Sequence, residues 1–216
     1  MRKALYGLLC VVMLCAYSSS FAEGEAKIED GDLGFSFFLG SVINEEFFVG
    51  ETDAIARFYG VGVAYHPLSF LSLEPGLFFM KTDYEYENKL TGQADKEDRL
   101  LIGGSLGLYY NANLAEGLYV YLGPRLDNAR YEVDRDNGDG SKRESREQAM
   151  SISAVFGLKY LFNDHFALFA DFGVGYFSKN EKEKYWNNAA VLTTNGETRT
   201  DYVALSRGLL GVVFYL

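Results

Sequence analysis

Along most of this chain, apolar side chains alternate with polar or small ones. Between Arg99 and Tyr110, one parity carries Leu100, Ile102, Leu106, Leu108 and Tyr110, and the other carries Arg99, Gly103, Ser105 and Gly107. The chain ends in the same way, with Leu210, Val212, Phe214 and Leu216 opposite Arg207, Leu209, Gly211, Val213 and Tyr215. Successive side chains of an extended strand point to opposite faces. The pattern therefore predicts strands with one apolar face.

Eight segments show this alternation, and each has the about 9–11 residues that a tilted strand needs to cross hydrocarbon. They are Leu33–Ile43, Ala54–Tyr65, Phe70–Thr82, Arg99–Tyr110, Gly117–Tyr131, Gln148–Leu161, Phe166–Ser178 and Arg199–Leu216.

The connections between these segments alternate in length. The short ones are residues 66–69, 111–116 and 162–165, whereas the long ones, 44–53, 83–98, 132–147 and 179–198, are polar and mostly charged. Short turns at one end and long loops at the other are typical of membrane barrels with both termini in the periplasm. The sequence therefore predicts an all-β fold, an eight-stranded antiparallel up-and-down transmembrane β-barrel.

Two prolines fall inside these segments. Pro75 and Pro124 both have the outward parity. Proline cannot donate to a ladder in a sheet that has no edges. We expect a bulge or a water-satisfied carbonyl beside each of them.

The first 22 residues have the pattern of a cleaved signal peptide. A basic start at Arg2 and Lys3 precedes a short apolar stretch, and small residues precede Glu23. A lipoprotein alternative is disfavoured because bulky Leu precedes both Cys10 and Cys15. The expected division is residues 1–22 as signal peptide and 23–216 as barrel. The mature part would contain no cysteine.

Charge narrows the possible partners. Without Arg2 and Lys3, 18 basic residues face 30 acidic ones, a formal charge of −12. This balance argues against nucleic acid or a polybasic lipid contact. No apolar run of the expected mature part approaches the about 20 residues of a membrane-spanning helix.

Gly-rich aromatic segments, Leu106–Tyr110 and Phe172–Tyr176, together with the closing segment, resemble small outer-membrane barrels of the opacity-protein and OmpA/OmpX type. The resemblance implies location in the cell outer membrane, contact with outer-membrane lipid, and insertion by the barrel assembly machinery. Members usually end in Phe, whereas this chain ends in Leu216. We expect Val212, Phe214 and Leu216 to form the C-terminal assembly signal.

The sequence offers no constellation typical of an enzyme. The two histidines, His66 and His165, fall in predicted short turns, and no serine sits beside them in an elbow motif. Residues 134–140 superficially resemble a calcium loop, but Gly138 and Asp139 invert the order that such a loop requires. We therefore expect no catalytic residue, no cofactor and no specific metal site.

The sharpest candidate site is a set of charged residues with inward parity. Its members are Glu74, Arg125, Asp127, Asp171 and Arg207, with Lys159 nearer the periplasmic rim. A lone charge in a narrow lumen is costly, so each should meet an opposite charge or trapped water. The set is either a salt-bridge plug or a gate. We expect Arg207 to pair with Glu74 or Asp171.

Two functions follow from this reading. The first is a non-enzymatic, monomeric structural or adhesin-like barrel whose long acidic loops contact host molecules, neighbouring cells or surface lipid. The second is a narrow channel or small-solute carrier gated by the lumen charges. A soluble lipocalin-like barrel would require an apolar lumen, whereas here the charged and small residues share the inward face. Conductance separates the first two functions.

Overall fold

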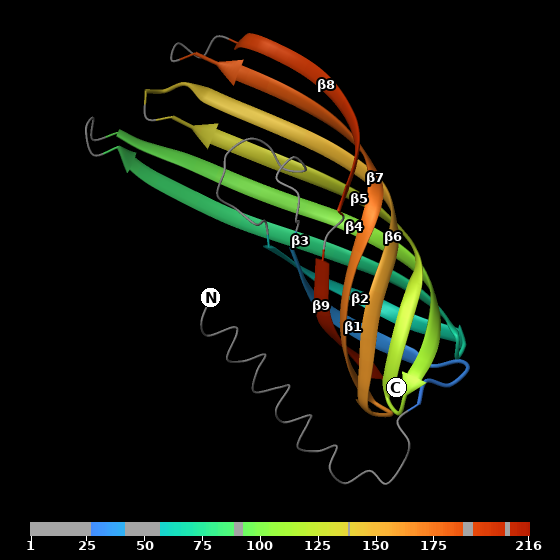
Figure 1. The fold of residues 1–216 in the computed structure, drawn as a ribbon. Helices are drawn as coiled ribbons and strands as arrows, with labels where there is room; N and C mark the ends of the chain where they lie inside the picture. The colour runs from blue at the N-terminus through green and yellow to red at the C-terminus, as the bar shows by residue number, and fades with distance from the viewer. Residues whose placement is uncertain (1–26, 42–56, 89–92, 138, 188–191, 206–207) are drawn as a thin grey trace.

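The computed structural model describes residues 27–41, 57–88, 93–137, 139–187, 192–205 and 208–216. These residues form one antiparallel sheet (Figure 1). Its strands are β1 (Leu33–Ser41), β2 (Arg57–Leu68), β3 (Leu71–Asn88), β4 (Gln93–Ala115), β5 (Leu118–Asp136), β6 (Lys142–Asn163), β7 (Phe166–Trp186), β8 (Leu192–Leu205) and β9 (Gly208–Tyr215).

The sheet closes into a ring that is eight strands around, because β8 and β9 share the place beside β7. Neighbouring strands in sequence pair from β1 to β7, and β9 pairs with both β7 and β1. β8 pairs with the Val174–Trp186 half of β7, and β9 with the Phe166–Asp171 half. β8 and β9 are therefore two parts of the eighth predicted strand, and the predicted barrel is confirmed.

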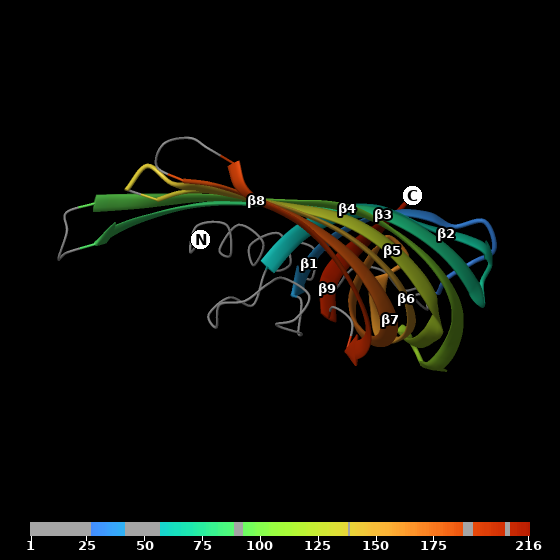
Figure 2. The same cartoon turned by 90° about the horizontal axis from the view of Figure 1, so that it is seen from above.

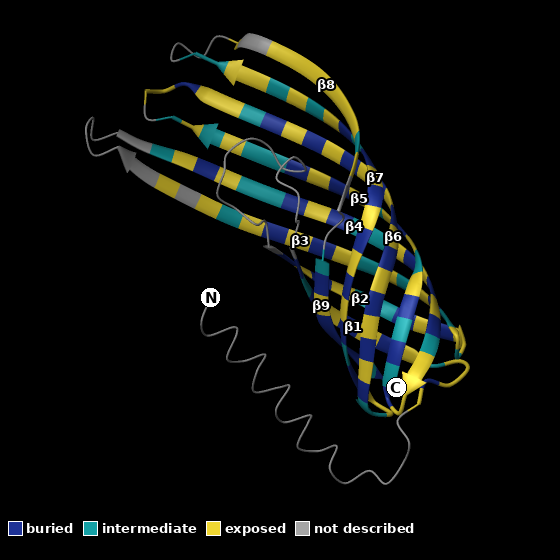
Figure 3. Ribbon diagram, in the orientation of Figure 1, coloured by how far each residue is buried: buried dark blue, intermediate teal, exposed yellow. Residues whose placement is uncertain are grey.

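Burial alternates along the strands (Figure 3). On β6, every odd residue from Ser145 to Leu161 is buried and every even one is exposed. Leu106 and Phe156 are 44% and 41% exposed, whereas Val155 is fully buried. The exposed side chains of the barrel wall are mainly Leu, Ile, Val, Phe and Tyr, as in a wall that faces lipid. The predicted faces of these strands are confirmed.

Three of the long loops predicted from the sequence are wrong, because most of their residues belong to paired strands. β3 continues to Asn88 and β4 begins at Gln93, so most of the predicted loop 83–98 is a paired hairpin. The predicted loops 132–147 and 179–198 are likewise largely strand. The ladder satisfies the backbone outside the membrane as well as within it. The alternation in Tyr84-Glu85-Tyr86-Glu87 was a sequence signal for this. The predicted loop 44–53 lies outside the described residues.

These hairpins form a six-stranded sheet beyond the apolar wall, which we call the extension. It comprises β3 from Lys81, β4 up to Arg99, β5 from Arg130, β6 up to Gln148, β7 from Lys179 and β8 up to Asp201. Seen from above, the extension leaves the barrel to one side (Figure 2).

The turns at the opposite end are shorter than predicted. The strands there are joined by Ser69-Phe70, Glu116-Gly117 and Asp164-His165. Gly117 has φ of +68°, a conformation that favours glycine in a tight turn. Because the strands reach further, residues such as His66 belong to strands rather than turns.

Of the two alternatives expected beside the prolines, the bulge is wrong, and the water-satisfied carbonyl stays a prediction. Around Pro75, Gly62 pairs with Gly76 and Tyr65 with Leu73 in one unchanged register. The β4–β5 register is also unchanged across Pro124. Each proline interrupts pairing on one side without adding a residue. The register shifts within the described strands lie near the turns.

Candidate functional site: the lumen charge network

Aromatic rings fill the lumen because nearby glycines, on the same strand or on a neighbouring one, leave room for them. A Cβ at Gly157 would lie 2.1 Å from the Tyr121 ring, and one at Gly107 would lie 2.3 Å from the Tyr109 ring. The Tyr109 and Tyr121 rings are themselves 5.2 Å apart. Eight strands enclose a lumen that side chains can fill, and these rings occupy it.

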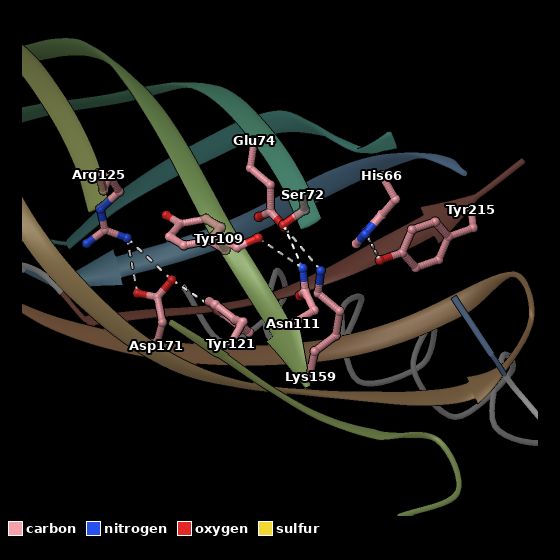
Figure 4. Close-up of polar contacts among 10 residues, drawn as sticks. All are labelled: His66, Ser72, Glu74, Tyr109, Asn111, Tyr121, Arg125, Lys159, Asp171 and Tyr215. Carbon is pink, nitrogen blue, oxygen red and sulfur yellow. Dashed lines mark hydrogen bonds and ion pairs between the residues drawn. The ribbon is translucent and has the colours of Figure 1, made fainter. Parts of the chain in front are cut away.

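One group of charges centres on Arg125 (Figure 4). Its Nη1 donates to Asp171 Oδ1 at 3.1 Å, and the Tyr121 hydroxyl donates to the other oxygen of Asp171 at 3.1 Å. Arg125 Nε lies 3.6 Å from Asp127, which also accepts a hydrogen bond from Ser151. One buried cation is thus balanced by two carboxylates.

The second group centres on Lys159, nearer the short-turn end. Its Nζ donates to Glu74 Oε1 at 3.1 Å, and Ser72 donates to the same oxygen at 3.0 Å (Figure 4). Asn111 in turn donates to Ser72. Lys159 also lies 5.6 Å from the Tyr121 ring centre, within cation–π range. That ring links the two groups.

The structure thus brings together five of the six predicted charges, but in two groups. Arg207 lies outside the described residues, so its pairing stays a prediction. The two carboxylates proposed for it, Glu74 and Asp171, accept hydrogen bonds from Lys159 and Arg125.

Sequence reasoning missed His66. We expected a residue of a short turn, but its side chain is fully buried and its Nε2 lies 3.2 Å from the Tyr215 hydroxyl (Figure 4). β2 continues to Leu68, so His66 keeps the inward parity of Ala64. Extending the predicted strand by one residue beyond Tyr65 would have included it.

The segment before β1 packs against the short-turn end of the lumen. Ile28 is buried, and its backbone N–H donates to the Tyr119 hydroxyl at 3.1 Å. Gly31 N–H donates to the His66 carbonyl, and His66 N–H donates to the Asp32 carbonyl. No periodicity in this segment indicated such a role.

The closing strand pairs with β1 and has its predicted faces, except in how far one side chain is exposed. Leu216 is 76% exposed, and its N–H donates to the Leu33 carbonyl, so the ladder reaches the last residue. Phe214 packs against Phe37 and Phe166. Val212 was expected on the open outer stripe, but it is only 6% exposed. It stands directly between Phe37 and Leu168 in the ladder, and neighbouring outward side chains cover it.

The extension carries charge on both faces. On the inner face, buried Lys179 contacts Glu147 at 3.1 Å and Glu181 at 3.3 Å. Burial raises the pKa of Glu147 to about 7, although Lys179 opposes the shift. On the outer face, four carboxylates are successive partners across four strands: Asp83, Asp98, Asp134 and Glu144. Like charges directly opposite one another destabilise a sheet.

Among the residues that the structure describes, no group of three or more His, Cys, Asp or Glu is placed to hold a metal ion. No helix within the described ranges is long and apolar enough to cross a membrane.

Residues 7–195 match the family model for the outer membrane protein beta-barrel domain. The chain belongs to this family. It is an outer-membrane β-barrel, and its location is the cell outer membrane. No curated protein matches the chain.

Solved structures show the same fold. OprG from Pseudomonas aeruginosa is 14% identical with a TM-score of 0.55, over 89% of this chain and 99% of that one. Ail, the attachment invasion locus protein of Yersinia pestis, is 14% identical with a TM-score of 0.50, over 87% and 99%. A major outer membrane protein from Thermus thermophilus is 12% identical with a TM-score of 0.52, over 85% and 99%.

Proposed function

We propose that this protein is a non-enzymatic surface-interaction barrel whose extension contacts molecules outside the cell. The observation that carries the proposal is the extension itself. Three paired hairpins project beyond the apolar wall and present charged side chains on both faces. A paired sheet holds these side chains in fixed positions, which lowers the ordering cost of binding.

The lumen beneath supports a contact role over transport. Tyr109, Tyr121, Arg125 and Lys159 are buried across it, and Ile28 packs at the short-turn end. The two charge groups are held by hydrogen bonds that any conducting path would have to break.

Each surface of the barrel has the chemistry of one expected partner. The apolar wall contacts outer-membrane lipid, and the barrel assembly machinery recognises the closing strand around Phe214. The ligand of the extension is a host or cell-surface molecule, contacted through side chains such as Asp98 and Asp134. The acidic chain disfavours nucleic acid.

Attachment of intact cells tests this function. Cells displaying the wild type should adhere to host-cell monolayers, and Asp98→Asn with Asp134→Asn should change that adhesion. The control variant, Glu116→Gln with Asp164→Asn, removes the same charge from exposed residues at the short-turn end. Equal adhesion of all three strains, at equal surface display, would contradict the proposal.

A gated narrow channel or small-solute carrier is the second candidate. One observation favours it: His66 Nδ1 and Asn111 Oδ1 are buried without a hydrogen-bond partner among the described residues. Such atoms require water, and water in the lumen is a starting point for conduction. Planar-bilayer recording of the wild type and of Lys159→Met distinguishes this candidate from the contact function. A large rise in conductance in the variant would favour the gate.

A further inference from the structure

One edge of the extension is formed by β8, the last strand of the sheet. Within the described residues, β8 pairs only with β7. Residues 195–201 are all exposed, so the side chains on both faces of this part of β8 are open to solvent. A free edge presents backbone N–H and C=O groups to another strand.

The hydrogen-bond pattern tells which residues of β8 face that edge. Tyr215 N–H donates to the His165 carbonyl, so the odd-numbered residues of β7 bond toward the last strand. Glu181 of β7 is paired with Thr198 of β8. In antiparallel sheets, bonded and non-bonded pairs alternate. The even residues of β8 therefore bond to β7, and the odd ones, including Glu197 and Arg199, present their backbone groups at the edge.

This edge is complementary to itself. If two copies pair antiparallel about Thr198, Glu197 of each lies opposite Arg199 of the other, and Asn195 lies opposite Asp201. All of these are odd residues, as the edge bonds require. Shifting the centre to Glu197 or to Arg199 would place like charges opposite each other, which is destabilising.

We propose that the β8 edge binds the β8 edge of a second copy of this chain, in the antiparallel register centred on Thr198. This inference rests on the proposed function, because it takes the extension as the contact surface, and it names a second copy as one partner. The contact is isologous, with the same patch on both copies, and it joins two extensions into one continuous sheet. Each barrel remains a single-chain unit in its membrane.

Two local features fit this register. Gly196 would lie opposite Thr200 of the second copy, and no heavy atom lies within 4 Å of the position that a Cβ on Gly196 would take. In the single copy, Glu197 contacts Lys182 at 3.4 Å and Arg199 contacts Asp201 at 3.5 Å, all at exposed positions. Exposed pairs of this kind contribute little, so they do not block exchange of partners.

Cysteine cross-linking tests the register. In a full-length chain with Cys10→Ser and Cys15→Ser, a Thr198→Cys variant places two thiols in a directly opposed, non-bonded pair. Their Cα atoms would be about 4.5 Å apart, within disulfide range. The matched control is Thr200→Cys, whose thiols would be separated by about 13 Å along the strands. Mild oxidation should give several-fold more dimer with Thr198→Cys, and equal or greater dimer with Thr200→Cys would overturn the proposal.

Charge exchange gives an independent measure. Glu197→Arg and Arg199→Glu should each lower the Thr198→Cys dimer yield at least several-fold, because like charges then face each other. Mixing these two variants restores opposite charges at both positions and should recover the yield. Heat-modifiability on a gel verifies that each barrel is folded. A mixture no better than either single variant would overturn the pairing.

The two copies can come from one membrane or from two facing membranes. Differently tagged proteins in separate vesicle populations should yield mixed dimers only if the contact forms between membranes, whereas co-reconstituted proteins report contact within one. Mixed dimers in neither arm would overturn the proposal. Such a failure would leave adhesion to host cells, the test of the proposed function, unaffected.

Discussion

Lys159 and Glu74 form an ion pair across the lumen. Lys159 lies on β6 and Glu74 on β3, strands that are not neighbours in the sheet, and the Nζ–Oε1 distance is 3.1 Å. Only the curvature of the closed barrel brings them together. The pair therefore ties opposite walls, and the ring of Tyr121 beside Lys159 connects it to the Arg125 group.

Replacing Lys159 by Met should destabilise the barrel by about 3–5 kcal/mol, because the Glu74 carboxylate would be left in the lumen without its charge partner. Adding Glu74→Gln should recover part of the loss, since contact between two residues appears as coupling in a double-mutant cycle. Urea unfolding in lipid vesicles measures the free energies. As a control, the exposed Lys81–Asp83 pair at 3.5 Å should show coupling below about 1 kcal/mol. Additive effects of Lys159→Met and Glu74→Gln would contradict a direct pair.

Gly157→Ala should destabilise the barrel by about 1–3 kcal/mol, the usual cost of overpacking. The new Cβ would lie 2.1 Å from the Tyr121 ring, which cannot move without loosening its hydrogen bond to Asp171. Gly104→Ala is the matched control. Its Cβ would meet its nearest neighbour at 3.6 Å, an ordinary contact, and its effect should be small. Both variants are compared by unfolding in the same vesicles, and equal losses would show that the ring does not restrict Gly157.

Deleting Phe214–Leu216 should prevent assembly, because the β1 ladder and the packing of Phe214 on Phe37 and Phe166 are lost together. Leu216→Phe should be neutral or mildly favourable, since position 216 is largely exposed. Surface display and heat-modifiability report assembly. Normal display of the truncated chain would mean that β9 does not close the sheet.

Glu147 should make stability depend on pH. It lies outside the apolar wall, whose first exposed apolar residue on β6 is Met150, and burial raises its pKa from 4.5 to about 7. The folded state then holds this proton more tightly than the unfolded state, so Glu147 favours folding more as pH falls from 7 to 4.5. The slope approaches about 1.4 kcal/mol per pH unit within that window.

Glu147→Gln should remove this contribution. Carboxyl carbon chemical shifts measured by NMR should place the wild-type midpoint near 7, and Lys179→Met should raise the pKa further because the charge that opposes the shift is lost. A midpoint near 4.5 would show that the carboxyl is solvated.

The strands could be predicted from sequence because membrane and lumen impose opposite chemistry on alternate residues. From Leu100 to Tyr110 on β4 and from Met150 to Tyr160 on β6, the outward side chains are apolar or small, although some inward ones, such as Leu101 and Val155, are apolar too. Outside the membrane neither face meets lipid, so the apolar contrast between the two parities falls, and the alternation in residues 83–87 does not distinguish a strand from a loop. The prediction of where strands end is therefore inaccurate, and His66 was assigned to a turn as a result.

The sequence by itself determined the barrel, five of the six inward charges and the strand that closes the ring, because each depends on parity along one strand. Only the tertiary structure decided that Lys159 meets Glu74 and that Arg125 meets Asp171, since these contacts cross the lumen between strands that do not pair. The insertion of Ile28 beside Tyr119 was likewise decided by packing at the end of the barrel. Parity fixes the face of a side chain, whereas barrel closure fixes which faces meet.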